Sequence, residues 1–202
     1  STQGVSSAAS DVYKRQLYRR GGIAHGAIGK ITSACWKTNP WVIEGDDQDN
    51  ATDETAWERG NKQVFTPKFW RAVAEADKRR LVGRYSGLLL QVRDSGRWDE
   101  PIKRKGSQLV KMIPTWAGSL KPAGFNTNAQ DEGYGTVSKW QYTEYGMEGN
   151  AGRKVDIHPD RVFILGDASC DAIGFLEPAY NAFVSLELSL IHISEPTRLG
   201  MI

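Results

Sequence analysis

Short apolar runs separated by turns most constrain what this chain can fold into. Such runs are typical of strands, and they occupy residues 88–92, 109–116, 135–145 and 161–165, with an extended segment at 154–157. In the third run, Trp140 and Tyr142 alternate with Lys139 and Gln141, which predicts one apolar and one polar face. Pro114 has no backbone N–H to donate, so the run around it is expected at a sheet edge.

Helical periodicity flanks these strands. Apolar residues recur at steps of three and four in residues 17–38 and 171–187, and again after Thr66 and Pro67, which suit the N-cap and first position of a helix. The last helix is expected to become regular only near Glu177, because Pro178 fits a first turn.

The region between the first two helices is less regular. Residues 40–45, PWVIEG, predict a short strand, and the acidic, polar stretch 46–62 predicts an exposed loop. Helices at the two ends around short mixed or antiparallel strands predict an α+β fold, because alternating βαβ units are not seen.

The two ends of the chain mirror each other at the level of DNA. Residues 11–16, DVYKRQ, can be written in the codons GAT GTG TAT AAG AGA CAG, and the reverse complement of that DNA translates as LSLIHI, residues 188–193. Both peptides resemble read-through of the transposase adapters used in sequencing-library preparation, and added segments are set aside before fold reasoning. We therefore expect residues 1–16 and 188–202 to be adapter-derived, residues 17–187 to be the biological domain, and the natural protein to be longer at both ends.

Charge and composition limit the classes of function. The formal net charge is only +2 at pH 7, which argues against a dedicated nucleic-acid binder with a dominant basic surface. The basic clusters 78–80 and 103–105 are expected on solvated faces. No run approaches the roughly 20 apolar residues that a membrane-spanning helix needs. All seven Trp residues fall within 17–187, and because Trp is favoured at the centres of interfaces, a subunit of an assembly is plausible.

The residues that could carry chemistry do not complete a known pattern. Cys35 and Cys170 lie far apart without metal-ligand spacing, so a reduced intracellular setting is expected. Residues 21–32 resemble a phosphate-binding loop, but Ile31 stands where a hydroxyl is needed, and a helix with small residues for close packing explains the stretch better. The acidic residues 44–49 fail the residue count of an EF-hand calcium loop.

Two histidines remain within residues 17–187. His25 lies near a helix start, and His158 precedes a proline in a turn, flanked by Asp156 and Asp160. A carboxylate beside an imidazole could do acid-base work, but neither a nucleophile nor a second site completes the set. We therefore assign no catalytic, cofactor-binding or metal-binding residue, and no enzyme activity is expected.

Taken in order, several short motifs resemble the N-terminal part of tailed-phage portal proteins, in particular a portal-like family also named for an anti-CBASS protein. The first are Tyr18 with the GIA helix at 22–24, then Trp36 and the strand at 40–43. The others are LVGRYSGLLLQVRDSGRWDEPI, VKMIPTW, a Gly-x-x-x-Lys-Trp-x-Tyr strand, IHPDRVFILGD and FLEPAYNAFVSLE, at residues 81–102, 110–116, 135–142, 157–167 and 175–187. IHPDRV is the most telling, because its proline-fixed turn would deliver Arg161 to the mouth of a buried strand.

The resemblance implies a portal-wing-like domain and a structural role. Portal proteins form homo-oligomeric rings, commonly of twelve subunits, at the capsid vertex through which DNA is packaged and ejected, and they contact terminase, capsid and tail-adaptor proteins. It would place the chain in the virion, and in the host cytoplasm during assembly, with no cofactor and no membrane. Two alternatives stay open: a nucleotide- or nucleic-acid-processing enzyme that cleaves cyclic nucleotides, and a nucleic-acid-binding module.

Overall fold

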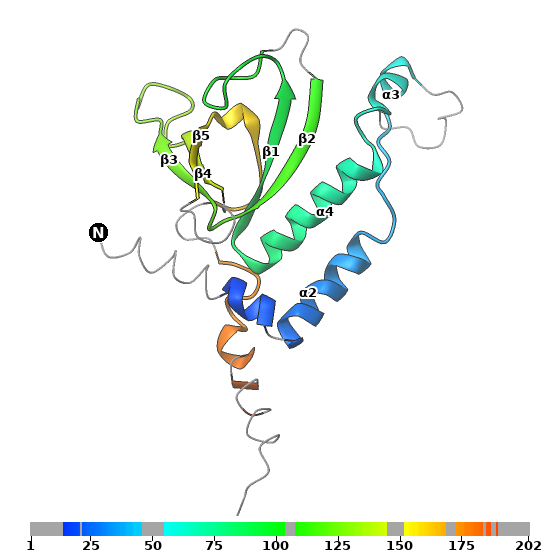
Figure 1. Cartoon of the computed structure of the whole chain (residues 1–202), viewed down its shortest axis with the longest axis vertical. Coiled ribbons are helices and arrows are strands. Elements are labelled where there is room, and N and C mark those ends of the chain that lie inside the picture. Colours follow the sequence, from blue (N-terminus) through cyan, green and yellow to red (C-terminus); the bar gives the residue numbers. More distant parts are fainter. Residues whose placement is uncertain are drawn as a thin grey trace, which may run out of the picture.

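The computed structural model describes residues 14–20, 22–45, 55–103, 108–144, 152–168, 173–183, 185–186 and 189. Its centre consists of two antiparallel sheets of three strands each (Figure 1). In one sheet, β1 (Tyr85–Arg93) lies between β2 (Gln108–Trp116) and β6 (Val162–Gly166). In the other, β4 (Val137–Thr143) lies between β3 (Leu120–Phe125) and β5 (Lys154–Ile157). The α+β prediction is therefore confirmed.

A hydrophobic core joins the two sheets. It is formed by buried side chains from β1, the turn after β2, β3, β4 and β5, namely Tyr85, Leu89, Ala117, Leu120, Trp140 and Ile157. The Tyr85 hydroxyl also donates to the carbonyl oxygens of Ala117 and Leu120, which ties the first strand to the corner between the sheets. A Cβ added at Gly87 would overlap the Leu120 side chain, so the close approach of the strands requires glycine here.

The outer face of the first sheet is covered by α4 (Pro67–Val82). Its N-cap Thr66 accepts from the Phe69 N–H at 3.4 Å, as the sequence predicts. The buried Ser86 hydroxyl donates to the Ala76 carbonyl at 2.6 Å. Because β1 meets α4 on one face and the core on the other, it is apolar on both faces, which explains the continuous Leu88–Leu90 run.

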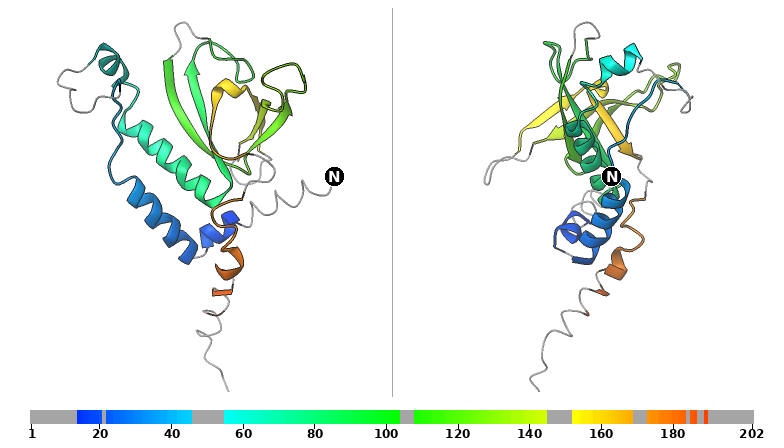
Figure 2. Two further views of the ribbon diagram at one scale, coloured as in Figure 1. Left: turned by 180° about the vertical axis from the view of Figure 1, so that it is seen from behind. Right: turned by 90° about the vertical axis from the view of Figure 1, so that its right-hand side faces the viewer.

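A second apolar cluster forms among the helices. The helix α2 (Gly22–Cys35) lies beside α4 (Figure 1, Figure 2). The buried members of this cluster are Tyr18, Ile28, Leu81, Val82 and Leu176, with Trp116 and Phe183 packed against them. Leu176 therefore brings the C-terminal region back against the helices near the start of the described chain.

Two predictions between α2 and α4 are wrong. Residues 40–45 form no strand, and the Trp41 side chain is 90% exposed, because no neighbouring strand pairs with this segment. Within the stretch expected to be a loop, Ala56–Asn61 forms the helix α3. Thr55 and Glu58 cap it reciprocally, each side chain accepting from the other residue's backbone N–H, a signal that the acidic composition obscured.

Other elements also differ from the prediction. Helical structure is described for residues 14–20 and for Gly22–Cys35, which ends before the expected residue 38, and residue 21 lies outside the described residues. The strand β3 was not predicted, because Pro122 and Gly124 interrupt its pattern, and both lie at register shifts where β3 pairs with β4. Residues 175–179 form turns, and helix begins only at Tyr180, later than the expected start near Glu177, while 171–172, 184 and 187 lie outside the described residues.

The glycines of α2 do not serve close packing. The helix predicted for residues 22–32 is confirmed, but a Cβ added at Gly22, Gly26 or Gly29 would meet nothing within 4 Å. The apolar contacts of α2 come instead from Ala24 and Ile28, which are fully buried. Close packing by small residues therefore holds for Ala24 and not for these three glycines.

Lys14 belongs to the segment that we expect to be adapter-derived. Its side chain is buried, and its Nζ lies 2.7 Å from the Glu177 carboxylate. Hydrogen bonding by Lys14 lowers the pKa of Glu177. An ion pair of this kind does not distinguish a natural residue from an added one, so the origin of residues 1–16 stays a prediction.

Candidate functional site

The turn IHPDR forms as the sequence predicts. Pro159–Arg161 is one turn of 3-10 helix, and His158 is its N-cap, with Nδ1 accepting from the Asp160 N–H at 3.2 Å. Pro159 suits the first position because its fixed backbone angle matches the turn and it needs no hydrogen-bond acceptor. The turn ends directly at β6, so Arg161 lies at the mouth of that strand, but the strand is half-buried at the end of its sheet and not the buried strand that the sequence predicts.

Arg161 is the centre of a buried polar network. Its guanidinium donates to the Asp94 carboxylate at 2.6 Å and to the Glu100 carbonyl at 2.7 Å, and the two charged side chains are only 3% and 0% exposed. Asp94 also accepts from the backbone N–H groups of Gly96 and Lys103. The network therefore holds the loop between β1 and β2 against the 3-10 turn.

The charge of Asp94 is strongly favoured in the folded state. The pKa of Asp94 is lowered from 3.8 to about 2. The hydrogen bond from Arg161 is the main cause, the N–H groups of Gly96 and Lys103 also lower the pKa, and desolvation of the carboxylate opposes them. The two side chains are buried and bonded to each other and to backbone groups on both sides, so the pair holds the loop in place. Its role is structural.

A pH dependence of stability follows from this pKa. Because the folded value lies below the unfolded one, ionised Asp94 stabilises the fold above about pH 4, and this stabilisation is lost as the pH falls from about 4 towards 2. Urea unfolding between pH 5 and pH 2 measures the effect. Asp94→Asn is expected to be less stable at pH 5 and to show a shallower slope in that window, and equal slopes would contradict the assignment.

The histidines and their neighbouring carboxylates are not assembled into one site. Asp156 is engaged by Lys139 at 3.2 Å and Gln141 at 3.4 Å, and these bonds lower its pKa. Asp160 lies 3.6 Å from the His158 imidazole, within the same turn. His25 stacks on Tyr18 at 4.8 Å between ring centroids, in the helical part of the molecule.

The basic cluster 78–80 is only partly a solvated face, because its side chains are half-buried and paired. Arg79 pairs with Glu75 at 3.2 Å, donates to the Pro114 carbonyl and lies over the Trp116 ring. Arg80 pairs with Asp77, whose carboxylate also accepts from the Trp36 indole N–H. These contacts join α4 to β2 and α2, which the sequence prediction missed, because the partners lie in other elements. In the other cluster, residues 104 and 105 lie outside the described residues.

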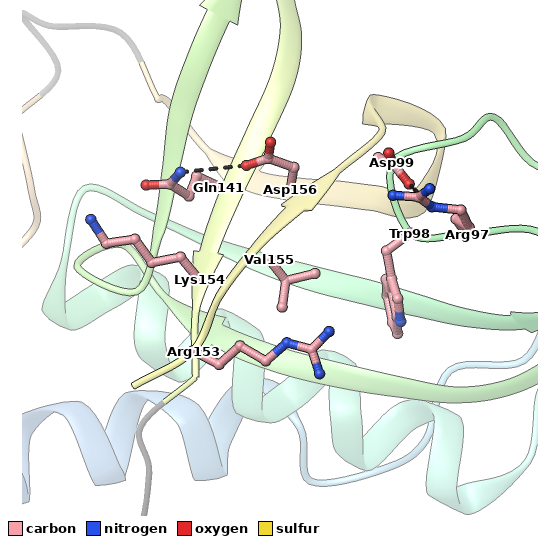
Figure 3. Close-up of a pocket in the computed structure, with 8 residues that line it drawn as sticks. All are labelled: Arg97, Trp98, Asp99, Gln141, Arg153, Lys154, Val155 and Asp156. Atoms are coloured by element: carbon pink, nitrogen blue, oxygen red, sulfur yellow. Dashed lines mark hydrogen bonds and ion pairs between the residues drawn. The ribbon is translucent and has the colours of Figure 1, made fainter. Parts of the chain in front are cut away.

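An open cavity of about 430 Å³ lies between the loop at residues 97–99 and β5 (Figure 3). It is lined by Arg97, Trp98, Asp99, Gln141, Arg153, Lys154, Val155 and Asp156. Arg97 pairs with Asp99 at 3.1 Å. No Ser, Thr, Cys or His side chain lines it, and in the described ranges no group of three His, Cys, Asp or Glu side chains could hold a metal ion.

Six aromatic side chains lie between the end of α2 and the first turn of α4, and we call this part of the chain the aromatic arm: Trp36, Trp41, Trp57, Phe65, Phe69 and Trp70. Phe65, Phe69 and Trp70 contact one another with centroid distances of 5.0–5.8 Å, and Trp36 lies 6.4 Å from Trp70. All six keep exposed surface. The Glu44 N–H donates to the Glu58 carboxylate, which ties the segment that carries Trp41 to α3.

Comparison with protein-family models finds no match, and a search among curated proteins finds none either. Of the helices that the structure describes, none is both long and apolar enough to cross a membrane. Cys35 is exposed and forms no disulfide, whereas Cys170 and acidic residues 46–49 lie outside the described residues.

Proposed function

We propose that this chain is a fragment of a structural subunit of a phage portal ring, part of the capsid vertex through which DNA is packaged and ejected. The proposal begins from the order of sequence motifs. It is supported by what the motif IHPDR does, since Arg161 is used to hold a loop in place and is not directed at a ligand. In this proposal the subunit belongs to the virion and, during assembly, to the host cytoplasm.

The aromatic arm is the observation that carries the proposal. Trp41 is 90% exposed and Trp57 is also exposed, although Trp is costly to leave in water. Aromatic side chains are enriched at interfaces, where they dominate the binding energy. A ring subunit must bury such a surface against its neighbours, and the aromatic arm belongs to α3, the start of α4 and the segments joining the helices, away from the core of the sheets (Figure 1).

The aromatic arm gives a prediction about assembly. In the protein made from the uninterrupted natural gene, Trp41→Ser together with Trp57→Ser is expected to weaken subunit association by about tenfold or more. The melting temperature of the dissociated subunit should change little, because both side chains are exposed. Native mass spectrometry measures the oligomer. Tyr134→Ser, also exposed but on the β3–β4 hairpin, is the control and should leave association unchanged.

The source DNA tests the whole proposal. Terminase and capsid genes beside the uninterrupted reading frame, and rings of the purified product in negative-stain electron microscopy, are expected. A metabolic operon around the gene together with a monomeric product would overturn the proposal. The same recovered sequence tests the division at residues 16 and 188. The natural gene is expected to lack both adapter-like segments.

The two alternatives have separate tests. Conversion of a cyclic nucleotide to a linear one, abolished by His25→Ala or His158→Ala, would favour an enzyme. Retention of a DNA oligonucleotide at low salt would favour a nucleic-acid-binding module. The portal proposal comes first because the structure holds His25 and His158 in contacts that belong to different parts of the fold.

A further inference from the structure

The outer edge of β5 presents backbone groups for pairing. Among the residues that the structure describes, β5 is the last strand of its sheet and pairs with β4 alone, in the register Lys154 with Thr143 and Asp156 with Gln141. The Glu144 N–H donates to the Arg153 carbonyl, so Arg153 belongs to a hydrogen-bonded pair. Because such pairs alternate in an antiparallel ladder, the N–H and C=O groups of Lys154 and Asp156 point away from β4.

The next backbone N–H that points away from β4 belongs to His158, and it already has an acceptor. The His158 N–H donates to the Trp98 carbonyl at 2.8 Å, which is the bond expected of a neighbouring strand. Trp98 lies in a turn, so this single bond does not continue along β5. The cavity of about 430 Å³ lies beside the two remaining outward residues, with the loop at 97–99 as its other wall (Figure 3).

The walls of this cavity carry excess positive charge. Arg97 is matched by Asp99, and Lys139 is matched by Asp156. Arg153 and Lys154 form no side-chain hydrogen bond or ion pair with another residue that the structure describes. Arg153 and Val155 point towards Trp98, whereas Lys154 lies on the opposite side of the strand (Figure 3).

The cavity and the adjoining outer edge of β5 together form a groove. We propose that this groove binds an acidic segment of another protein in extended conformation, which pairs with the outer edge of β5. Its backbone bonds the outward groups of Lys154 and Asp156, its carboxylates meet Arg153 and Lys154, and an apolar side chain packs on Trp98. An acidic peptide fits better than a phosphate polymer because the groove offers a strand edge as well as two cations. Binding here is independent of ring formation.

The test uses the whole chain and a fluorescein-labelled pentapeptide, Glu-Glu-Val-Glu-Glu, which in extended conformation offers carboxylates to both faces of the strand and a valine to the face of Trp98. Fluorescence anisotropy is expected to show saturable binding, and the amide resonances of Lys154 and Asp156 are expected to shift in NMR spectra. Arg153→Ser with Lys154→Ser should weaken binding about tenfold or more. Lys111→Ser with Lys121→Ser removes the same charge at exposed positions on β2 and β3, and should leave the affinity within about twofold.

Two further probes separate strand pairing from simple attraction between charges. A backbone N-methylated form of the peptide keeps its charge but cannot donate to the strand edge, and it is expected not to bind. A short oligothymidylate should bind no more tightly than this methylated peptide. Equal binding of all three probes would overturn the proposal in favour of a non-specific anion site. The absence of binding by any probe would also overturn the proposal. In that case the role of Arg153 and Lys154 would be to prevent aggregation at the exposed edge of β5.

Discussion

Arg161→Leu is expected to lower the melting temperature by roughly 10 °C, because it leaves the Asp94 carboxylate buried without its charged partner. The carboxylate would keep only the N–H groups of Gly96 and Lys103, and the Glu100 carbonyl would lose its donor. The loop between β1 and β2 should then open, so trypsin should cleave after Arg97 faster than in the parent chain. Calorimetry and timed proteolysis measure the two effects.

Matched variants separate the buried pair from a general loss of charge. Arg97→Leu removes an arginine of the same loop whose side chain is 78% exposed, and its pair with Asp99 is expected to contribute little. Arg161→Leu combined with Asp94→Leu should recover part of the loss, since no unpaired charge then remains. A melting temperature of Arg161→Leu equal to that of Arg97→Leu would contradict the structural role.

Trp140→Ala is expected to lower the free energy of unfolding by about 3–5 kcal/mol, as for other large aromatic residues removed from cores. The Trp140 side chain is buried at the centre of β4 and lies 6.2 Å from the Tyr85 ring across the core. Its loss would leave a cavity between the two sheets that neither backbone can close. Urea unfolding followed by circular dichroism measures the change.

Two comparisons keep this result interpretable. Trp140→Phe retains much of the ring contact and should fold with a smaller loss, so it gives a value even if the alanine variant does not fold. Phe125→Ala removes a large aromatic side chain from the neighbouring strand, where it is exposed, and should change stability by less than about 1 kcal/mol. Equal losses for Phe125→Ala and Trp140→Ala would mean that the core does not lie between the sheets.

Local signals predicted several elements well. The Thr66-Pro67 start of α4 and the alternation around Trp140 have short-range causes, namely capping and the two-residue period of a strand. Trp140 and Tyr142 do pack on the core, whereas Lys139 and Gln141 both meet Asp156 on the other face. β2 is an edge strand, as Pro114 predicts.

Other elements depended on partners far away in the chain. The apolar residues at 40–45 resemble a strand, but nothing in the described structure pairs with them, so they form no strand and stay largely exposed. β3 forms despite Pro122 and Gly124, because pairing with β4 and burial of Leu120 outweigh its poor propensity. Local strand propensity therefore predicts little where contacts between distant segments determine the structure.

The candidate surfaces show the same division. The sequence predicts the turn that carries Arg161, but its partner Asp94 lies 67 residues away. The groove needs the loop at 97–99, β4 and β5 to meet, and no single stretch of sequence contains that arrangement. The number of Trp residues suggests an interface, but the sequence does not show which of them are exposed.

The sequence by itself determined the α+β class, the helix cap at Thr66, the alternating faces of β4 and the proline-fixed turn before β6. Each of these depends on residues within a few positions of one another, so their physics is local. Only the tertiary structure decided the pairing of β3, the burial of Arg161 with Asp94 and the charged groove beside β5. These depend on which segments meet in space, and that is set by the summed burial and hydrogen bonding of the whole domain.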